Sequence, residues 1–142
     1  MTDNHLLAAL HGGADAAAFL HLPEGTRLSH GVTRARAGAF AGALAACGVE
    51  PGDRVMVQVD KCADQIALYL GTVMAGAVFV PLNTAYTATE VAYFAQTAEP
   101  RVFVVDPERA AELAPVAAGA TVETLGPAGA GTLAAAVEAA TP

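Results

Sequence analysis

The sequence predicts an α/β fold: a largely parallel, doubly wound sheet flanked by helices and preceded by a small β-hairpin. Two observations lead to this prediction. From residue 33 to residue 140, short apolar runs alternate with longer helical patterns, an order that is typical of βαβ units. The run Val102–Val105 has no polar alternation, which indicates a strand covered on both faces, as in a parallel sheet.

The length and composition fit a single domain over residues 1–142. The chain has 142 residues, of which 54% are apolar, so it is long enough to bury a core and too apolar for a disordered chain. We place the hairpin at about residues 17–30 and the α/β part at about residues 33–140.

The N-terminal region predicts a short helix followed by the hairpin. Asn4–His11 has a helical pattern and stops at a Gly-Gly pair. Ala17–Leu22 and Arg27–His30 are extended runs, and Pro23–Gly25 between them is typical of a turn.

Thr33–Cys47 predicts the first long helix. Phe40, Ala43, Leu44 and Cys47 recur at helical spacing. Gly48 follows, where a left-handed residue commonly ends a helix.

The next unit reads as strand, helix and strand. Val55–Val59 is an apolar run after a Pro-Gly turn, and Ala77–Val80 is a second one. Between them, Cys62–Ala75 is apolar on almost every side, which predicts a helix buried against several neighbours.

The remaining elements are predicted from their start signals. Thr87 and Glu90 fit a capping box for a helix that ends near Ala98. Asp106 before Pro107 is typical of another helix start. A weak strand at Thr121–Leu125 and an alanine-rich helix at Thr132–Ala140 complete the order.

The charge pattern argues against two classes of partner. Acidic residues outnumber basic ones 14 to 7, and the formal net charge is -7. A protein that binds nucleic acid or an anionic membrane surface would usually have the opposite sign and a basic cluster. No segment is apolar for long enough to span a bilayer, and the first ten residues lack a basic signal-peptide region.

The candidate chemical residues favour structural roles. Cys47 and Cys62 are expected to be buried, reduced thiols, since the histidines show no metal-ligand spacing with either. Lys61, the only lysine, is expected to be an exposed residue at a helix start. Gly126–Thr132 has the glycine spacing of a phosphate loop, but it lacks the lysine and reads as a surface turn before a helix capped by Thr132.

One segment, Met74–Asp106, carries a resemblance to a known family. A helix ends at Ala75-Gly76, the strand Val78–Val80 follows, and Pro81-Leu82-Asn83 closes it. This order resembles a core motif of the adenylate-forming enzymes, and its continuation Asn83–Thr87 resembles the malonyl-CoA synthetase branch. Cys47–Val55 is also typical of the family.

A second motif matches the family less well. Arg27–His30, followed by Arg34, is similar to the family's first core motif, but His30 stands where Tyr is usual and Thr33 where Leu is usual.

The resemblance implies an ATP-dependent ligase that activates a carboxylate as an acyl-adenylate and transfers the acyl group to CoA. ATP, Mg and CoA are implied for a longer parent enzyme. The residues that bind them in the family lie beyond the segment that this chain resembles, so no catalytic, cofactor-binding or metal residue is assigned here.

The chain is therefore interpreted as the N-terminal segment of an acyl-CoA ligase, expected to be inactive alone. The alternatives are a non-catalytic interaction module derived from such an enzyme and a flavodoxin-like binder of a small ligand. We expect a cytoplasmic protein whose apolar surface is covered by the rest of a parent enzyme or by self-association as a dimer.

Overall fold

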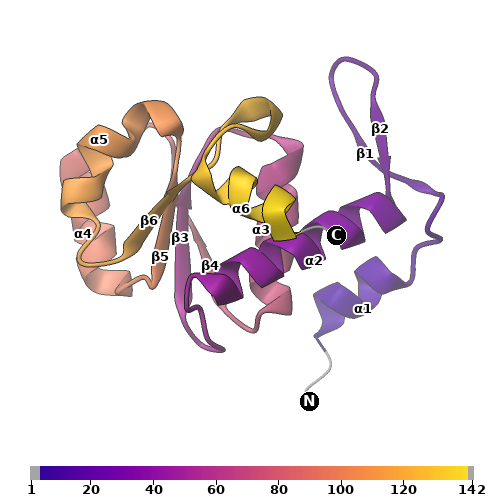
Figure 1. The fold of residues 1–142 in the computed structure, drawn as a ribbon, viewed down its shortest axis with the longest axis horizontal. Helices are drawn as coiled ribbons and strands as arrows, with labels where there is room; N and C mark the ends of the chain where they lie inside the picture. The colour runs from indigo at the N-terminus through magenta and orange to yellow at the C-terminus, as the bar shows by residue number, and fades with distance from the viewer. Residues whose placement is uncertain (1–3, 141–142) are drawn as a thin grey trace.

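The computed structural model describes residues 4–140 and has a sheet between two layers of helices, with a hairpin beside them (Figure 1). The central sheet has four parallel strands in the order β4-β3-β5-β6. Its strands are β3 (Arg54–Gln58), β4 (Val78–Pro81), β5 (Val102–Val105) and β6 (Thr121–Thr124). The predicted fold class is confirmed.

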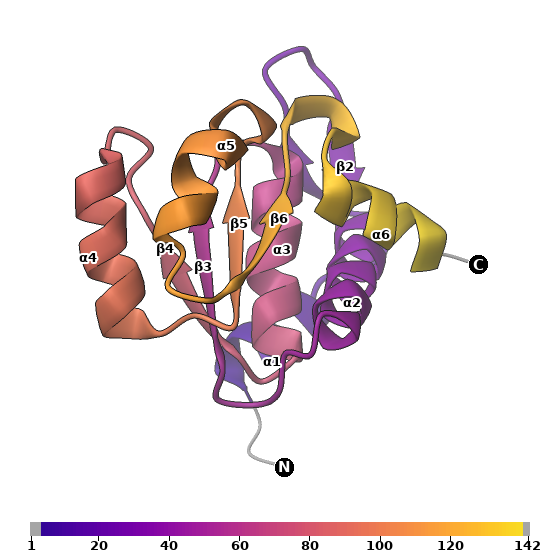
Figure 2. The same ribbon diagram turned by 60° about the vertical axis from the view of Figure 1, so that its left-hand side comes forward.

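The helices divide between the two faces of the sheet (Figures 1 and 2). One face carries α2 (His30–Ala46), α3 (Ala63–Met74) and α6 (Thr132–Ala140), and the other carries α4 (Ala88–Ala98) and α5 (Ala110–Leu113). Short 3-10 turns are η1 (Pro107–Arg109), η2 (Ala114–Val116) and η3 (Pro127–Gly129).

Side chains that alternate along the central strands β3 and β5 fill the core on both faces of the sheet. Val55 and Val57 of β3 pack toward α2, α3 and α6, whereas Met56 packs toward α4 and α5. All four residues of β5 are buried, as the lack of polar alternation at Val102–Val105 predicts.

The N-terminal elements lie beside α2. Helix α1 (His5–His11) and the antiparallel hairpin of β1 (Ala18–His21) and β2 (Arg27–Ser29) agree with the predicted order. Helix α2 begins at His30, three residues earlier than predicted, because the Ser29 side chain accepts a hydrogen bond from the backbone N–H of Val32 and caps it.

The direction of winding reverses at β3. The chain passes from β3 to β4 through α3 on one face, then crosses through α4 on the other face to reach β5 on the opposite side of β3. The carboxyl ends of β3 and β5 therefore flank the topological switch point, where ligands commonly bind in open α/β sheets.

Candidate functional site

A small crevice lies at the switch point, outside the carboxyl ends of β3 and β5. Its volume is about 140 Å³. Its lining comes from the end of β3, the loop after β4 and the start of η1: Gln58, Val59, Asp60, Thr84, Asp106, Glu108 and Arg109. Three carboxylates and one guanidinium thus meet in a space that holds only a few water molecules.

Gln58 is the buried centre of this region, with 2% of its surface exposed. Its side-chain Nε2 donates to the carbonyl of Asn83 at 2.7 Å and, more weakly, to that of Tyr86 at 3.4 Å. Its Oε1 accepts from Arg109 Nη1 at 2.9 Å. The amide therefore ties the end of β3 to the loop after β4 and to η1.

Arg109 holds the same loop from the other side. Its guanidinium donates to the carbonyls of Thr84 and Tyr86, each at 3.3 Å. Glu112 accepts two further bonds from it, at 3.1 and 3.3 Å. Because these partners occupy most of its donors, Arg109 acts as a brace for the loop.

The loop itself is built from local turn chemistry. The Asn83 side chain accepts from the backbone N–H of Ala85 at 2.9 Å, an Asx turn. The predicted capping box then starts α4: Glu90 N–H donates to Thr87 Oγ1, and Glu90 Oε2 accepts from Thr87 N–H at 2.7 Å. The Asn83–Thr87 segment that carries the family resemblance is thus a rigid turn.

The predicted turn at Gly126–Thr132 packs closely against β6. A Cβ at Gly131 would lie 2.3 Å from the Thr124 carbonyl oxygen, so this glycine allows close approach to β6. The hydroxyl of Thr132 donates to Glu123 and accepts from Thr124 N–H at 2.9 Å. The prediction that Thr132 caps its own helix is therefore wrong, since its side chain bonds to β6.

Lys61 is exposed, as predicted. The nearby carboxylate of Asp64 pairs with Arg36. Arg36 of α2 makes two 2.9 Å bonds to Asp64 of α3 and also pairs with Glu138 of α6. The Phe40 ring lies 5.4 Å from the same guanidinium. These acidic partners raise the pKa of Arg36, chiefly because Asp64 accepts two hydrogen bonds from it. Arg36 therefore joins three helices as a permanent cation.

Both cysteines are free and half-buried rather than fully buried. Burial raises the pKa of the Cys47 thiol, and Glu123, which accepts a hydrogen bond from it at 3.8 Å, adds to the increase. Burial likewise raises the pKa of Cys62. A raised pKa disfavours the thiolate, so neither environment is that of an activated nucleophile.

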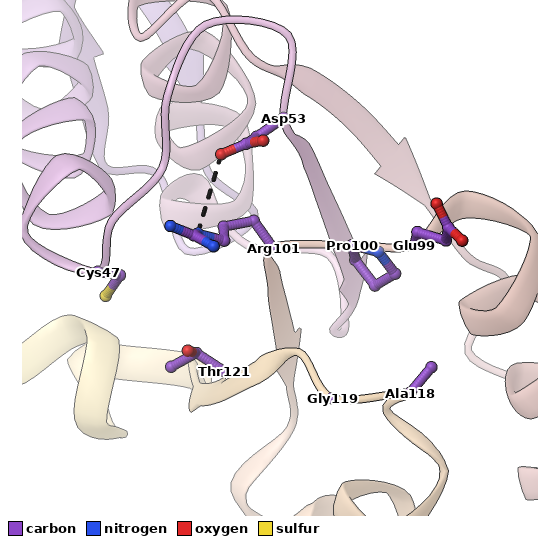
Figure 3. Close-up of a pocket in the computed structure, with 8 residues that line it drawn as sticks. All are labelled: Cys47, Asp53, Glu99, Pro100, Arg101, Ala118, Gly119 and Thr121. Atoms are coloured by element: carbon purple, nitrogen blue, oxygen red, sulfur yellow. Dashed lines mark ion pairs between the residues drawn. The ribbon is translucent and has the colours of Figure 1, made fainter.

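A second pocket opens at the amino ends of the strands (Figure 3). Its lining is Cys47, Asp53, Glu99, Pro100, Arg101, Ala118, Gly119 and Thr121. Arg101 lies at its centre, where Nε donates to the Gly48 carbonyl at 3.0 Å and lies 4.0 Å from Asp53. The side chain of Arg101 is 54% exposed, so it is far less constrained than Arg109. Arg54, at the same end of the sheet, donates to the carbonyls of Ala98, Gly52 and Glu99.

Within residues 4–140, no cluster of His, Cys, Asp or Glu has the arrangement of a metal site. Over the same residues, no helix combines the length and apolar character needed to cross a bilayer. The described residues thus offer a braced turn at the switch point.

Comparison with known proteins identifies the family. Residues 7–139 match the family described as AMP-binding enzyme. The chain belongs to this family.

Solved structures agree with the family match. The chain is 44% identical to MatB, a malonyl-CoA synthetase from Rhodopseudomonas palustris, with a TM-score of 0.85. The match covers 94% of this chain and 27% of MatB. MatB has also been crystallised with ATP bound.

Curated relatives include acid–CoA ligases and peptide synthetases. The chain is 41% identical over 66 residues to 3-hydroxybenzoate--CoA/4-hydroxybenzoate--CoA ligase of Thauera aromatica, covering 46% of this chain and 13% of the relative. It is 38% identical over 101 residues to phenyloxazoline synthase MbtB of Mycobacterium sp. (strain MCS), covering 66% and 9%. The chain therefore spans a small part of the proteins that it matches.

The family match confirms the resemblance read from Met74–Asp106, whereas the residues that organise the site were missed. Gln58 and Arg109 were not singled out from the sequence. The available signal was Gln58 itself, a polar residue within the apolar run Val55–Val59, because a buried amide requires partners.

Proposed function

We propose that this chain is the N-terminal subdomain of an ATP-dependent acid–CoA ligase that acts on malonate. The observation that carries the proposal is the 44% identity to MatB over 94% of the chain. A benzoate CoA ligase and an anthranilate CoA ligase of the same fold are 22% and 20% identical over similar shares of the chain. Family membership sets the flavodoxin-like alternative aside.

The geometry favours a supporting role for this subdomain. Its polar centre, Gln58 with Arg109, satisfies backbone carbonyls of the Asn83–Tyr86 turn and leaves few donors for a ligand. The nucleotide and acyl sites would be supplied by further parts of the ligase. We therefore expect no acyl-adenylate formation by residues 1–142 alone.

A chimera tests the proposal. This chain would replace the matched 27% of MatB, and CoA-thioester formation would be measured with malonate. We expect a working enzyme, because the braced turn is retained, and a folded chimera that forms no thioester would contradict the proposed function. The substrate is tested in a full-length ligase that contains this chain, where better use of octanoate than of malonate would contradict the proposal.

A second experiment uses the isolated chain. Carboxylate-dependent ATP–pyrophosphate exchange would be measured with malonate, methylmalonate and acetate. We expect no exchange above a blank without protein. Exchange by residues 1–142 would show that the described residues contain a nucleotide site after all.

A further inference from the structure

The two edge strands, β4 and β6, end the sheet in different ways. Edge strands expose unpaired backbone groups, and proteins usually protect them with charge, with side chains or with a covering element. In this chain β6 has such protection and β4 has little.

The β6 edge is closed by its own chain. Because Thr121 and Leu125 donate their N–H groups to β5, Val122 and Thr124 face outward by alternation. The outward N–H of Thr124 donates to Thr132 Oγ1 at 2.9 Å. Glu123 adds a carboxylate that bonds to Thr132 and Cys47.

Within residues 4–140, the β4 edge carries no charge and has little cover. Val78 and Leu82 donate their N–H groups to β3, so the backbone groups of Phe79 and Pro81 face outward. Pro81 has no N–H, which leaves Phe79 N–H as the outward donor of β4 and the carbonyls of both residues as acceptors. No charged side chain lies on this strand.

Apolar side chains flank this edge on both faces of the sheet. Ile66, Tyr69 and Val73 form a stripe along α3, and the Tyr69 and Phe79 rings lie 4.9 Å apart. Ile66 is 38% exposed and Tyr69 is 39% exposed. Val78, which points to the opposite face by alternation, is 49% exposed.

We propose that the β4 edge and the stripe on α3 are the docking surface for an extended, apolar segment of the ligase polypeptide outside this chain. This inference rests on the proposed function. The occupant is chosen because the match covers 27% of MatB, so most of that enzyme is available to cover the edge. A strand here would bond to Phe79 N–H and place uncharged side chains over both faces.

Two substitutions measured in two contexts test the surface. Ile66→Glu would be made in the isolated chain and in the MatB chimera, with Tyr93→Glu as the matched control, because Tyr93 is a helix residue that is 65% exposed. We expect Ile66→Glu to lower the Tm of the chimera by about 5 °C more than that of the isolated chain, because only the chimera would bury the new charge completely. Tyr93→Glu should change neither.

Hydrogen exchange gives a second readout that needs no substitution. The Phe79 amide should exchange at least about 100-fold more slowly in the chimera than in the isolated chain, because a paired strand protects it. The Val122 amide of β6 serves as the internal comparison.

Three results would overturn the proposed docking surface. The first is an equal loss of Tm on Ile66→Glu in the isolated chain and in the chimera, and the second is a Phe79 amide that exchanges equally fast in both proteins. The third is a chimera that does not fold because the MatB segment fails to fit. A dimer of the isolated chain that Ile66→Glu dissociates, with the chimera unaffected, would assign the edge to a second copy instead. The activity of the unsubstituted chimera is a separate result: a folded, inactive chimera with a protected Phe79 amide would contradict the proposed function and leave the surface standing.

Discussion

Two arginines at opposite ends of the sheet, Arg109 and Arg101, are held very differently. At the carboxyl end, Arg109 bonds to Gln58, to two loop carbonyls and to Glu112. At the amino end, Arg101 bonds to one carbonyl and lies 4.0 Å from a carboxylate. The side chains are 27% and 54% exposed, respectively.

The difference indicates which of the two arginines fixes the conformation of its surroundings. Buried polar groups with all partners present fix a single arrangement, and removal of one partner is costly. A half-exposed guanidinium exchanges its bonds with water at little cost. We infer that the turn after β4 has its shape set by the carboxyl-end network, and that Arg101, in the pocket of Figure 3, contributes little to the fold.

The largest expected effect is at Gln58. Gln58→Leu would leave the Asn83 carbonyl and one Arg109 donor without their buried partner. We expect the free energy of unfolding to fall by about 3 kcal/mol. Urea denaturation measures it, with Gln65→Leu on the partly exposed side of α3 as the control. A loss no larger than that of the control would mean that water replaces the amide.

Arg109→Lys should have the next largest effect. An ammonium group cannot reproduce a planar fork that reaches Gln58, Thr84 and Tyr86 together. We expect a loss of about 1.5 kcal/mol, together with faster amide exchange in Asn83–Thr87. An unchanged exchange rate in this turn would contradict the bracing role, even if overall stability fell.

The sequence was sufficient to predict the features that depend on neighbours along the chain. The capping box at Thr87 and Glu90, the left-handed Gly48 and the buried run Val102–Val105 depend on local patterns, and the structure contains all three.

The contacts between distant segments could not be predicted from the sequence. Gln58 and Arg109 are separated by 51 positions, and Arg36 and Glu138 by 102. Such pairs meet only after the sheet order is fixed. Nothing at these positions predicts the order of the strands, because an arginine near a turn and an arginine on a helix both have the pattern of ordinary surface residues.

At the amino end, Cys47 gives a pH-dependent prediction. Its pKa is raised by burial and by Glu123, so the folded state favours the neutral thiol. This contribution to stability is fully present below the ordinary thiol pKa of about 8.5 and is lost as the pH rises through the higher folded value. Between pH 8 and pH 10.5, the urea midpoint should therefore fall more for the unsubstituted chain than for Cys47→Ala. Parallel curves would show that the thiol environment does not differ between the folded and unfolded states.

The smallest expected effect is at Arg101. Arg101→Met removes the bond to the Gly48 carbonyl, but that carbonyl lies at the rim of an open pocket, where water can replace the guanidinium. We expect the free energy of unfolding to change by less than about 0.5 kcal/mol. The comparison with Arg109→Met, measured in the same denaturation series, tests the difference between the two arginines. Equal losses in the free energy of unfolding would show that Arg109 stabilises the fold no more than Arg101 with Asp53 does. The turn after β4 would then owe its shape to Asn83 and Thr87 alone.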